Sequence, residues 1–306
     1  MLTNTQLIAL LQLPQMGRKS VIAIAEYAIL RKATPSSATE LNTFIEECKN
    51  KKVARGLKSY LETEISTAIA FAESIEKNSE ANGIKITSFC DKDYPAQLKQ
   101  LTKNGKNESP VILYSKGDYS LLNNMPNVAI IGTRTPTLPG NITTMHVAEE
   151  FAKAGFNIVS GLALGCDAAA HRAALGVGGK TTAILAHGLD MVYPPENKSL
   201  LNEILEKGGL ILSEYPIGTR PQQIFFVERD RLQAGTSVAT IVIEASATSG
   251  ARHAVKVAIA NQRQAFCTEY SKNILPAEEG SLFNEAPTLL TEDSLATTIT
   301  QLKQEF

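Results

Sequence analysis

The residues of this chain that are best suited to chemistry are anion-binding ones, and they follow short apolar runs. Arg134 comes three residues after the end of an apolar run at 128–131, and Gly161 follows another at 158–159. A guanidinium group is a planar donor that fits a phosphate, and glycine lets the backbone approach a ligand closely. Further along, Ser249 and Gly250 precede a helical pattern, and the first N–H groups of a helix favour negative charge. These residue types predict phosphate binding.

Aromatic and cationic residues accompany these turns. They are Phe225, Phe226, Arg229 and Arg231 between the fourth and fifth apolar runs, and Arg252 and His253 beside the Ser249-Gly250 turn. Rings and guanidinium planes stack on the bases of single-stranded nucleic acid, while cations follow its backbone. Taken singly, the aromatics also fit a hydrophobic core and the arginines fit ion pairs within the domain. Their common position after apolar runs favours binding.

The elements that must position these residues form an α/β pattern. Apolar runs at 128–131, 158–159, 182–185, 210–212, 239–243 and 265–267 alternate with helical patterns at 141–154, 167–175, 200–207, 229–234 and 251–262. Such alternation predicts an extended Rossmann-like, doubly wound and mostly parallel sheet. The carboxyl ends of parallel strands share one edge of the sheet, where ligands bind. We therefore expect the turns above to lie on that edge.

The first 80 residues have a different character and predict a small helical domain. The segment PQMGRKS (14–20) resembles the hairpin of a helix-hairpin-helix or SAM-like domain, in which glycines admit a phosphate. Gln15 and Arg18 replace two residues of that hairpin, which favours a packing role over DNA contact. The predicted organisation is a helical domain at 1–80 and a Rossmann-like domain at 81–306, with a lead-in at 81–127 and a core at 128–306.

Composition limits the function classes. The 306 residues are 43% hydrophobic and 20% charged with a net charge of −1, which excludes disorder and argues against general polyanion binding. The charge is uneven, because residues 220–264 hold six Lys/Arg against three Asp/Glu, whereas residues 268–306 hold two against seven. Four scattered cysteines predict neither disulfides nor a metal site. Without a leader or a run of about 18 apolar residues, we expect a cytoplasmic protein with no membrane contact.

Two cofactor motifs fail on inspection. The segment ALGVGGKT (174–181) loosely matches a phosphate-binding P-loop, but it follows a helical pattern and leads into a strand. A P-loop needs the opposite order, because the N-terminus of the following helix supplies the N–H groups. No GxGxxG fingerprint follows the first strand of the core. We therefore expect no cofactor.

Several motifs in order resemble one family. They are DYP (93–95), VAIIGTR (128–134), SGLALGCD (160–167) and FVERDR (226–231). The chain is identified on these as a member of the DNA-processing protein A (DprA/Smf) family. It resembles a divergent member that lacks the C-terminal winged-helix-like domain. The family usually has Asn where Asp230 stands, and Ser-Leu-x-Thr-Ala where residues 251–255 read ARHAV.

The resemblance implies a non-catalytic protein that binds single-stranded DNA, forms a homodimer and delivers strands to a RecA-type recombinase in natural transformation or recombination. It implies phosphate contacts from Arg134 and Lys180 and a base near Phe225 or Phe226. Arg229 would line the pocket, and Gly161, Ser249 and Gly250 would shape it.

Two other functions stay open. Related Rossmann-like enzymes hydrolyse nucleoside monophosphates with an Arg and a Glu at the strand ends, and Arg134 and Glu244 occupy such positions. Their turn resembles Pro-Gly-Gly-x-Gly-Thr-x-x-Glu, whereas this chain reads EASATSG (244–250). Under the DNA-binding hypothesis Glu214 and Glu244 satisfy backbone or arginine donors. The last alternative is a protein-interaction module in the helical residues 1–80.

Overall fold

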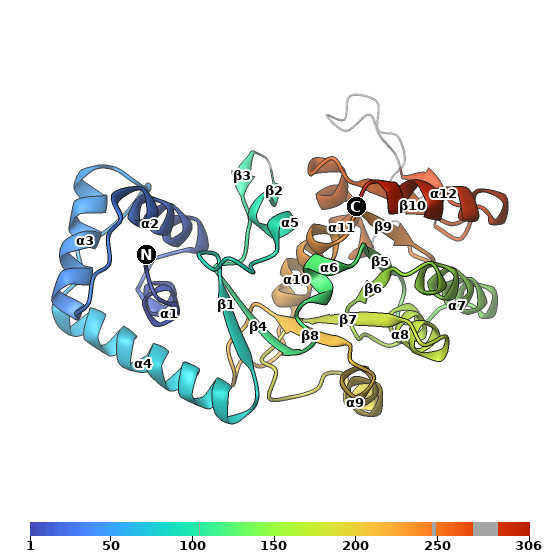
Figure 1. Ribbon diagram of the computed structural model, residues 1–306, viewed down its shortest axis with the longest axis horizontal. Coiled ribbons are helices and arrows are strands. Elements are labelled where there is room, and N and C mark those ends of the chain that lie inside the picture. The colour runs from blue at the N-terminus through green and yellow to red at the C-terminus, as the bar shows by residue number, and fades with distance from the viewer. Residues whose placement is uncertain (104, 247–248, 272–286) are drawn as a thin grey trace.

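A computed structural model describes residues 1–103, 105–246, 249–271 and 287–306. Its central element is a mixed sheet, which in the described part of the chain has nine strands in the order β1-β4-β8-β7-β6-β5-β9-β10-β11 (Figure 1). The strands are β1 (Lys85–Ser88), β4 (Ile112–Gly117), β5 (Asn127–Ile131), β6 (Asn157–Ser160), β7 (Lys180–Leu185), β8 (Leu210–Ser213), β9 (Ala239–Val242), β10 (Gln264–Cys267) and β11 (Thr288–Leu289). From β8 to β11 all neighbours are parallel, whereas β4 runs antiparallel to β8 and to β1. The predicted fold class is confirmed.

Helices connect the strands and cover both faces of the sheet. They are α7 (Leu138–Lys153), α8 (Cys166–Gly176), α9 (Lys198–Glu206), α10 (Gln223–Thr236), α11 (Ala251–Ala260) and α12 (Glu292–Gln304). Strands β5, β6 and β9 are buried along their whole length, as expected of strands packed on both faces. In β5, Val128 and Ile130 pack with Phe151 of α7, while Ile131 belongs to the cluster that contains Leu232 of α10. The two faces of the strand therefore serve two separate cores.

The N-terminal residues are helical, with α1 (Asn4–Gln12), α2 (Arg18–Arg31), α3 (Ala38–Asn50) and α4 (Glu62–Ala81) gathered beside β1 (Figure 1). The capping chemistry of α1 explains where it begins: the Thr3 hydroxyl accepts from the Gln6 N–H at 3.2 Å, and the Gln6 side chain accepts from the Thr3 N–H at 2.9 Å. This reciprocal pair satisfies two N–H groups that the helix itself leaves unpaired.

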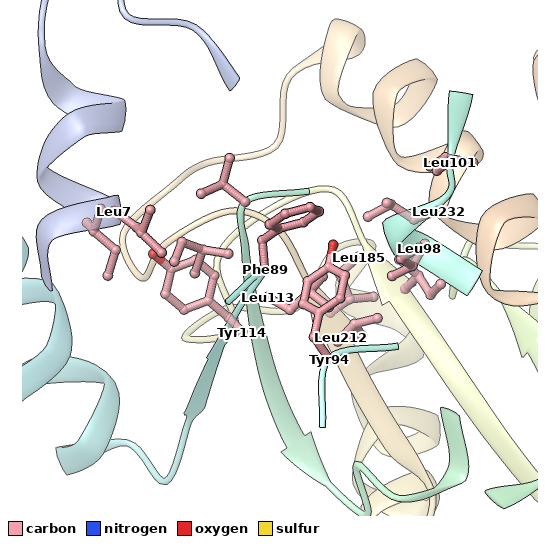
Figure 2. Close-up of a cluster of buried hydrophobic side chains, with 14 of the residues drawn as sticks. Leu7, Phe89, Tyr94, Leu98, Leu101, Leu113, Tyr114, Leu185, Leu212 and Leu232 are labelled. Carbon is pink, nitrogen blue, oxygen red and sulfur yellow. The ribbon is translucent and has the colours of Figure 1, made fainter. Parts of the chain in front are cut away.

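A short lead-in joins these helices to the sheet. After β1 it contains α5 (Ala96–Lys99), a hairpin of β2 (Thr102–Lys103) and β3 (Lys106–Asn107), then β4 and α6 (Leu121–Asn124). Figure 2 shows Leu7 of α1 next to Tyr114 of β4, and Leu98 and Leu101 beside Leu232 of α10. One continuous hydrophobic cluster therefore links the N-terminal helices, the lead-in and the helix α10 that carries much of the candidate site.

The order of strands reverses next to β5. The chain moves from β5 to β6, β7 and β8 on one side, and then crosses through α10 to β9 and β10 on the other. At such a point the two neighbouring loops turn away from each other and leave a crevice beyond the carboxyl ends of the strands.

Within the described residues, no helix is long and apolar enough to cross a membrane.

Candidate functional site

The crevice between β5 and β9 contains an open pocket of about 770 Å³. Its sides are the loop after β5, with Thr133 and Arg134, the N-terminal half of α10, and the start of α11. Of the residues predicted from the sequence, the structure brings five to this pocket: Arg134, Phe226, Arg229, Ser249 and Gly250. The volume lies in the range typical of small-molecule sites, and a nucleotide unit would fit it.

Helix α10 begins at Gln223, six residues before the start predicted from the sequence. Because helical residues four apart lie on the same face, Phe226 and Asp230 both point into the pocket, and both line it together with Gln223 and Gln233. This common face of one helix forms the longest side of the site.

Arg134 and two aromatic rings form the outer part of the pocket, which we call the mouth. The Arg134 guanidinium lies over the Phe226 ring, 5.3 Å from its centroid, and the Tyr193 ring lies 5.7 Å from the same ring. Arg134 is exposed, and Tyr193 is 40% exposed. A cation over a flat ring at the edge of a pocket is an arrangement that single-stranded nucleic acid uses, with a base on the ring and a phosphate on the cation.

Arg229 lies at the inner end of the pocket, which we call the floor. Its guanidinium donates from Nη1 to the Ile184 carbonyl at 2.9 Å, and its Nε lies 3.4 Å from Asp230 Oδ1. A methyl group added to Gly161 would lie 1.4 Å from Arg229 Nη1, so a side chain at position 161 is incompatible with this arrangement. The close backbone approach predicted for Gly161 therefore serves Arg229, and Gly161 itself does not line the pocket.

Two carboxylates accompany Arg229 on the floor. Asp167 is buried, and its Oδ2 accepts from the Gly161 and Ala163 N–H groups at 3.1 and 3.3 Å. Burial raises the pKa of the Asp167 carboxyl, and the neighbouring Arg229 opposes that shift. Burial also raises the pKa of Asp230 to about 7, with Arg229 and Arg134 lowering it and Asp167 raising it.

The start of α11 forms the side of the pocket opposite α10. Gly250 precedes the helix, and the Ser249 hydroxyl accepts from the Ala251 N–H at 3.3 Å. A second, smaller pocket of about 230 Å³ adjoins it and is lined by Ser249, Arg252, His253 and Lys256. Arg252 and His253 therefore lie beside the main pocket and do not line it. Ala247 and Thr248 of the predicted turn lie outside the described residues.

The structure contradicts the expected position of three residues. Lys180 is the first residue of β7, at the amino edge of the sheet, and its Nζ donates to the Lys207 carbonyl at 2.8 Å. Arg231 is only 4% exposed, donates to the Glu108 and Glu228 carbonyls, and forms an ion pair with Glu214. Phe225 packs on Tyr215 with ring centroids 4.3 Å apart and does not line the pocket. None of the three can join the site as it stands.

The basic residues of the N-terminal hairpin are also committed elsewhere. Arg18 forms ion pairs with Glu108, Glu214 and Glu228, and Lys19 lies 2.7 Å from Glu108. This charge network fastens the start of α2 to the β2–β3 hairpin and to α10. A packing role for the hairpin agrees with these contacts.

Glu244, the candidate catalytic carboxylate of a hydrolase, supports the start of α7. Its Oε2 accepts from the Thr137 N–H at 2.9 Å and from the Thr137 hydroxyl at 3.0 Å. The interpretation of Glu214 and Glu244 as acceptors for arginine and backbone donors is thus confirmed. Glu244 is absent from the lining of the described pocket, so Arg134 and Glu244 do not face a common ligand there.

Sequence reasoning did not assign most of the other lining residues to the site, among them Tyr193, Gln223, Asp230 and Gln233. Tyr193 follows β7 along the chain, so its place near the carboxyl edge was the available signal. Gln233 is 2% exposed. Its side-chain amide is oriented so that the oxygen accepts from the Gly161 N–H at 2.9 Å and the nitrogen donates to Asp230 Oδ1 at 3.3 Å. The positions of Gln223 and Gln233 depend on where α10 begins.

Comparison with known proteins gives a consistent result. The family model of DNA recombination-mediator protein A matches residues 85–305. Protein Smf of Synechocystis is 38% identical over 226 residues, which are 72% of this chain and 55% of that protein. DNA processing protein DprA of Bacillus subtilis is 34% identical over 202 residues, 66% of this chain and 63% of that protein. The chain therefore spans less than two thirds of the length of these relatives.

Two solved structures are similar as well. DNA processing protein A from Streptococcus pneumoniae is 27% identical, with a TM-score of 0.74 over 96% of this chain and 98% of that one. The second, from Helicobacter pylori, is 30% identical with a TM-score of 0.60 over 72% of this chain and 97% of that one. The H. pylori structure describes a single-stranded DNA binding mode of DNA processing protein A.

Proposed function

Because this chain belongs to the DNA recombination-mediator protein A family, we propose that it binds single-stranded DNA in the pocket between β5 and β9, without catalysing a reaction. The observation that carries the proposal is the Arg134 guanidinium lying over the Phe226 ring at the pocket mouth. A base can stack on Phe226 or Tyr193 while Arg134 pairs with the adjoining phosphate. The single-stranded DNA bound by the H. pylori relative supports the same class of ligand.

Contacts to the DNA backbone come from the mouth and from α11. The Gly250 N–H lies at the start of α11, where a helix favours negative charge, whereas the Ser249 N–H already donates to the Ser246 carbonyl at 2.9 Å, so Ser249 would contact a phosphate through its hydroxyl. Arg252 and His253 on the same helix line the adjoining pocket, where Arg252 adds a positive charge and His253 a ring nitrogen that can contact a phosphate. Arg229 acts from the floor as a positioning residue, because it is buried, its Nη1 donates to the Ile184 carbonyl and its charge is paired with Asp230. Lys180, Phe225 and Arg231 do not contact the DNA in this proposal.

The biological role we propose is that of the family: protecting exposed or incoming strands and loading a RecA-type recombinase in the cytoplasm, as a homodimer. One surface supports contact with another protein. Leu138, Ile142 and Met145 lie on one face of α7 and are 73%, 58% and 40% exposed. Apolar side chains that gather on one exposed helix face are typical of an interaction surface.

The test is fluorescence anisotropy of a labelled single strand, with a duplex of equal length as competitor. We expect wild-type protein to prefer the single strand and Arg134→Ala to bind it at least about tenfold more weakly, which is about 1.4 kcal/mol. Lys180→Ala is the matched control, because it removes one cation from the opposite edge of the sheet and should leave the affinity unchanged. Equal affinity of Arg134→Ala and wild type, or equal affinity for duplex, would overturn the proposal.

A further inference from the structure

The floor and the mouth of the pocket have opposite chemistry. At the mouth the charged group is the exposed Arg134, with the cations of α11 beside it. On the floor, the charge of Arg229 is matched by two carboxylates, Asp167 and Asp230. A floor with two carboxylates and one cation disfavours a phosphate. A ligand that is neutral and carries hydrogen-bond donors suits it, which describes the base of a nucleotide whose phosphate stays at the mouth.

Asp230 is the floor residue best placed to meet a base. Its side chain is 15% exposed, and its Oδ1 is the atom that contacts Arg229. The other oxygen is directed across the pocket, because a methyl group added to Gly250 would lie 3.5 Å from Oδ2. Among the residues that the structure describes, no hydrogen-bond donor to Oδ2 is present. This oxygen can therefore accept from a ligand between α10 and α11.

Phe226 fixes the direction from which a base would approach. It precedes Asp230 by four residues on α10, and one turn of an α-helix rises about 5.4 Å. A base stacked on the Phe226 ring would thus extend one edge along the helix towards Asp230. The ring supplies a face for any base, whereas the carboxylate contacts only the edge that carries the base's identity.

We propose that Asp230 selects the base in this pocket and favours guanine over thymine, an inference that rests on the proposed function. Guanine offers N1–H and the N2 amino group side by side, so it can donate two parallel hydrogen bonds to one carboxylate. Thymine offers a single N3–H between two carbonyl oxygens, and the carboxylate repels both of these oxygens. Adenine and cytosine each carry one amino donor beside an acceptor nitrogen, and rank between the two.

The protonation of Asp230 provides a second signature of the same contact. The charged groups around it are Arg229 on α10, Asp167 on α8 and Arg134 after β5, and burial places its pKa near 7. Above that pH the carboxylate is ionised and accepts both guanine donors. Below it the carboxyl is protonated and loses one acceptor position, so discrimination between guanine and thymine should weaken from about pH 8.5 to about pH 6.

The experiment compares competitor strands of about 20 nucleotides built on thymidine, in which every third base is thymine, guanine or hypoxanthine, in lithium buffer to prevent guanine quadruplexes. We expect the guanine strand to bind at least about fivefold more tightly than the all-thymine strand at about pH 8.5. Hypoxanthine keeps N1–H and lacks the 2-amino group, so its strand should lie between them. Asp230→Asn should bind the guanine and thymine strands with equal affinity. The control Glu206→Gln, which changes an exposed carboxylate on α9, should keep the guanine preference.

The outcomes separate this inference from the function on which it rests. Equal affinity for the three strands with single-strand binding intact would overturn base selection by Asp230 and leave the proposed function standing. A guanine preference that persists in Asp230→Asn would also overturn it. If no strand binds at all, the proposed function fails and the inference fails with it. The comparison of guanine with hypoxanthine uses wild-type protein and needs no variant to fold.

Discussion

The contact between Gly161 and Arg229 makes a sharp prediction about stability. In Gly161→Ala the added methyl carbon would lie 1.4 Å from Arg229 Nη1 and 2.2 Å from its Cζ. Non-bonded carbon atoms prefer separations of about 3.5–4.0 Å, so the whole guanidinium must move by about 2 Å. Arg229 is only 5% exposed, and its far end is held by the Ile184 carbonyl, so this movement breaks contacts.

The expected loss follows from those contacts. A buried acceptor left without its donor costs about 1–3 kcal/mol, and this applies to the Ile184 carbonyl. Asp230, which forms an ion pair with Arg229, then lies further from its cation, and removing one partner of a buried ion pair costs about 3–5 kcal/mol. Because Arg229 moves into the open pocket and is not deleted, only part of that second figure applies. We expect a loss of about 3 kcal/mol in the free energy of unfolding.

Urea unfolding of wild type and variant at one pH measures the loss. Gly176→Ala at the end of α8 is the matched control, since nothing lies within 4 Å of a methyl group there and the change should stay within about 1 kcal/mol of wild type. In a double-mutant cycle, adding Arg229→Ala should cost less in the Gly161→Ala background than in wild type. A loss below about 1 kcal/mol for Gly161→Ala, or strict additivity in the cycle, would refute the reasoning.

Two further predictions concern the charge network and pH. Arg18→Ala should lower the free energy of unfolding by about 1–3 kcal/mol, because Glu108 and Glu214 are 12% exposed and each loses one of its two cations, and should leave single-strand affinity unchanged. In the control Arg31→Ala, which breaks an ion pair between Arg31 (58% exposed) and Glu47 (36% exposed), the loss should stay below about 1 kcal/mol. Burial lowers the pKa of His171 to about 3. The unfolded state alone therefore takes up this proton below about pH 6.5, and wild type should lose about 1.4 kcal/mol per pH unit there relative to His171→Gln in urea titrations. Parallel curves for those two proteins would contradict a neutral His171.

The strands of the sheet could be predicted because they are buried on both faces. Such strands need continuous apolar runs, and each run predicted from the sequence overlaps a strand from β5 to β10. The resemblance to the DprA/Smf family is likewise confirmed by the match over residues 85–305. The division at residue 80 stays a prediction, since one hydrophobic cluster joins residues from both sides of it.

The start of α10 explains much of what the sequence did not reveal about the site. Gln222 precedes the helix without a side-chain capping bond, so no Ser, Thr, Asp or Asn marks this boundary. With the helix expected only from residue 229, Phe226 and Asp230 could not be assigned to a common face. The same helix turns Arg231 away from the pocket. Arg231 follows Arg229 by two residues, and residues two apart on a helix point in nearly opposite directions. Lys180 begins its strand, so strand direction alone places it at the amino edge of the sheet.

The arginines of this chain show why counting basic residues overestimates a binding surface. Arg134 is exposed over a ring, Arg229 is buried beside two carboxylates, and Arg231 is buried in an ion pair with Glu214. All three follow strands of the same sheet, yet only Arg134 has a guanidinium that a phosphate can approach without displacing a buried partner. Arg229 and Arg231 instead hold α10 against the sheet and the lead-in, with Phe226 and Asp230 facing the pocket. Under the proposed function, affinity for the DNA backbone therefore comes from the mouth and α11, whereas the shape of the pocket depends on the buried arginines.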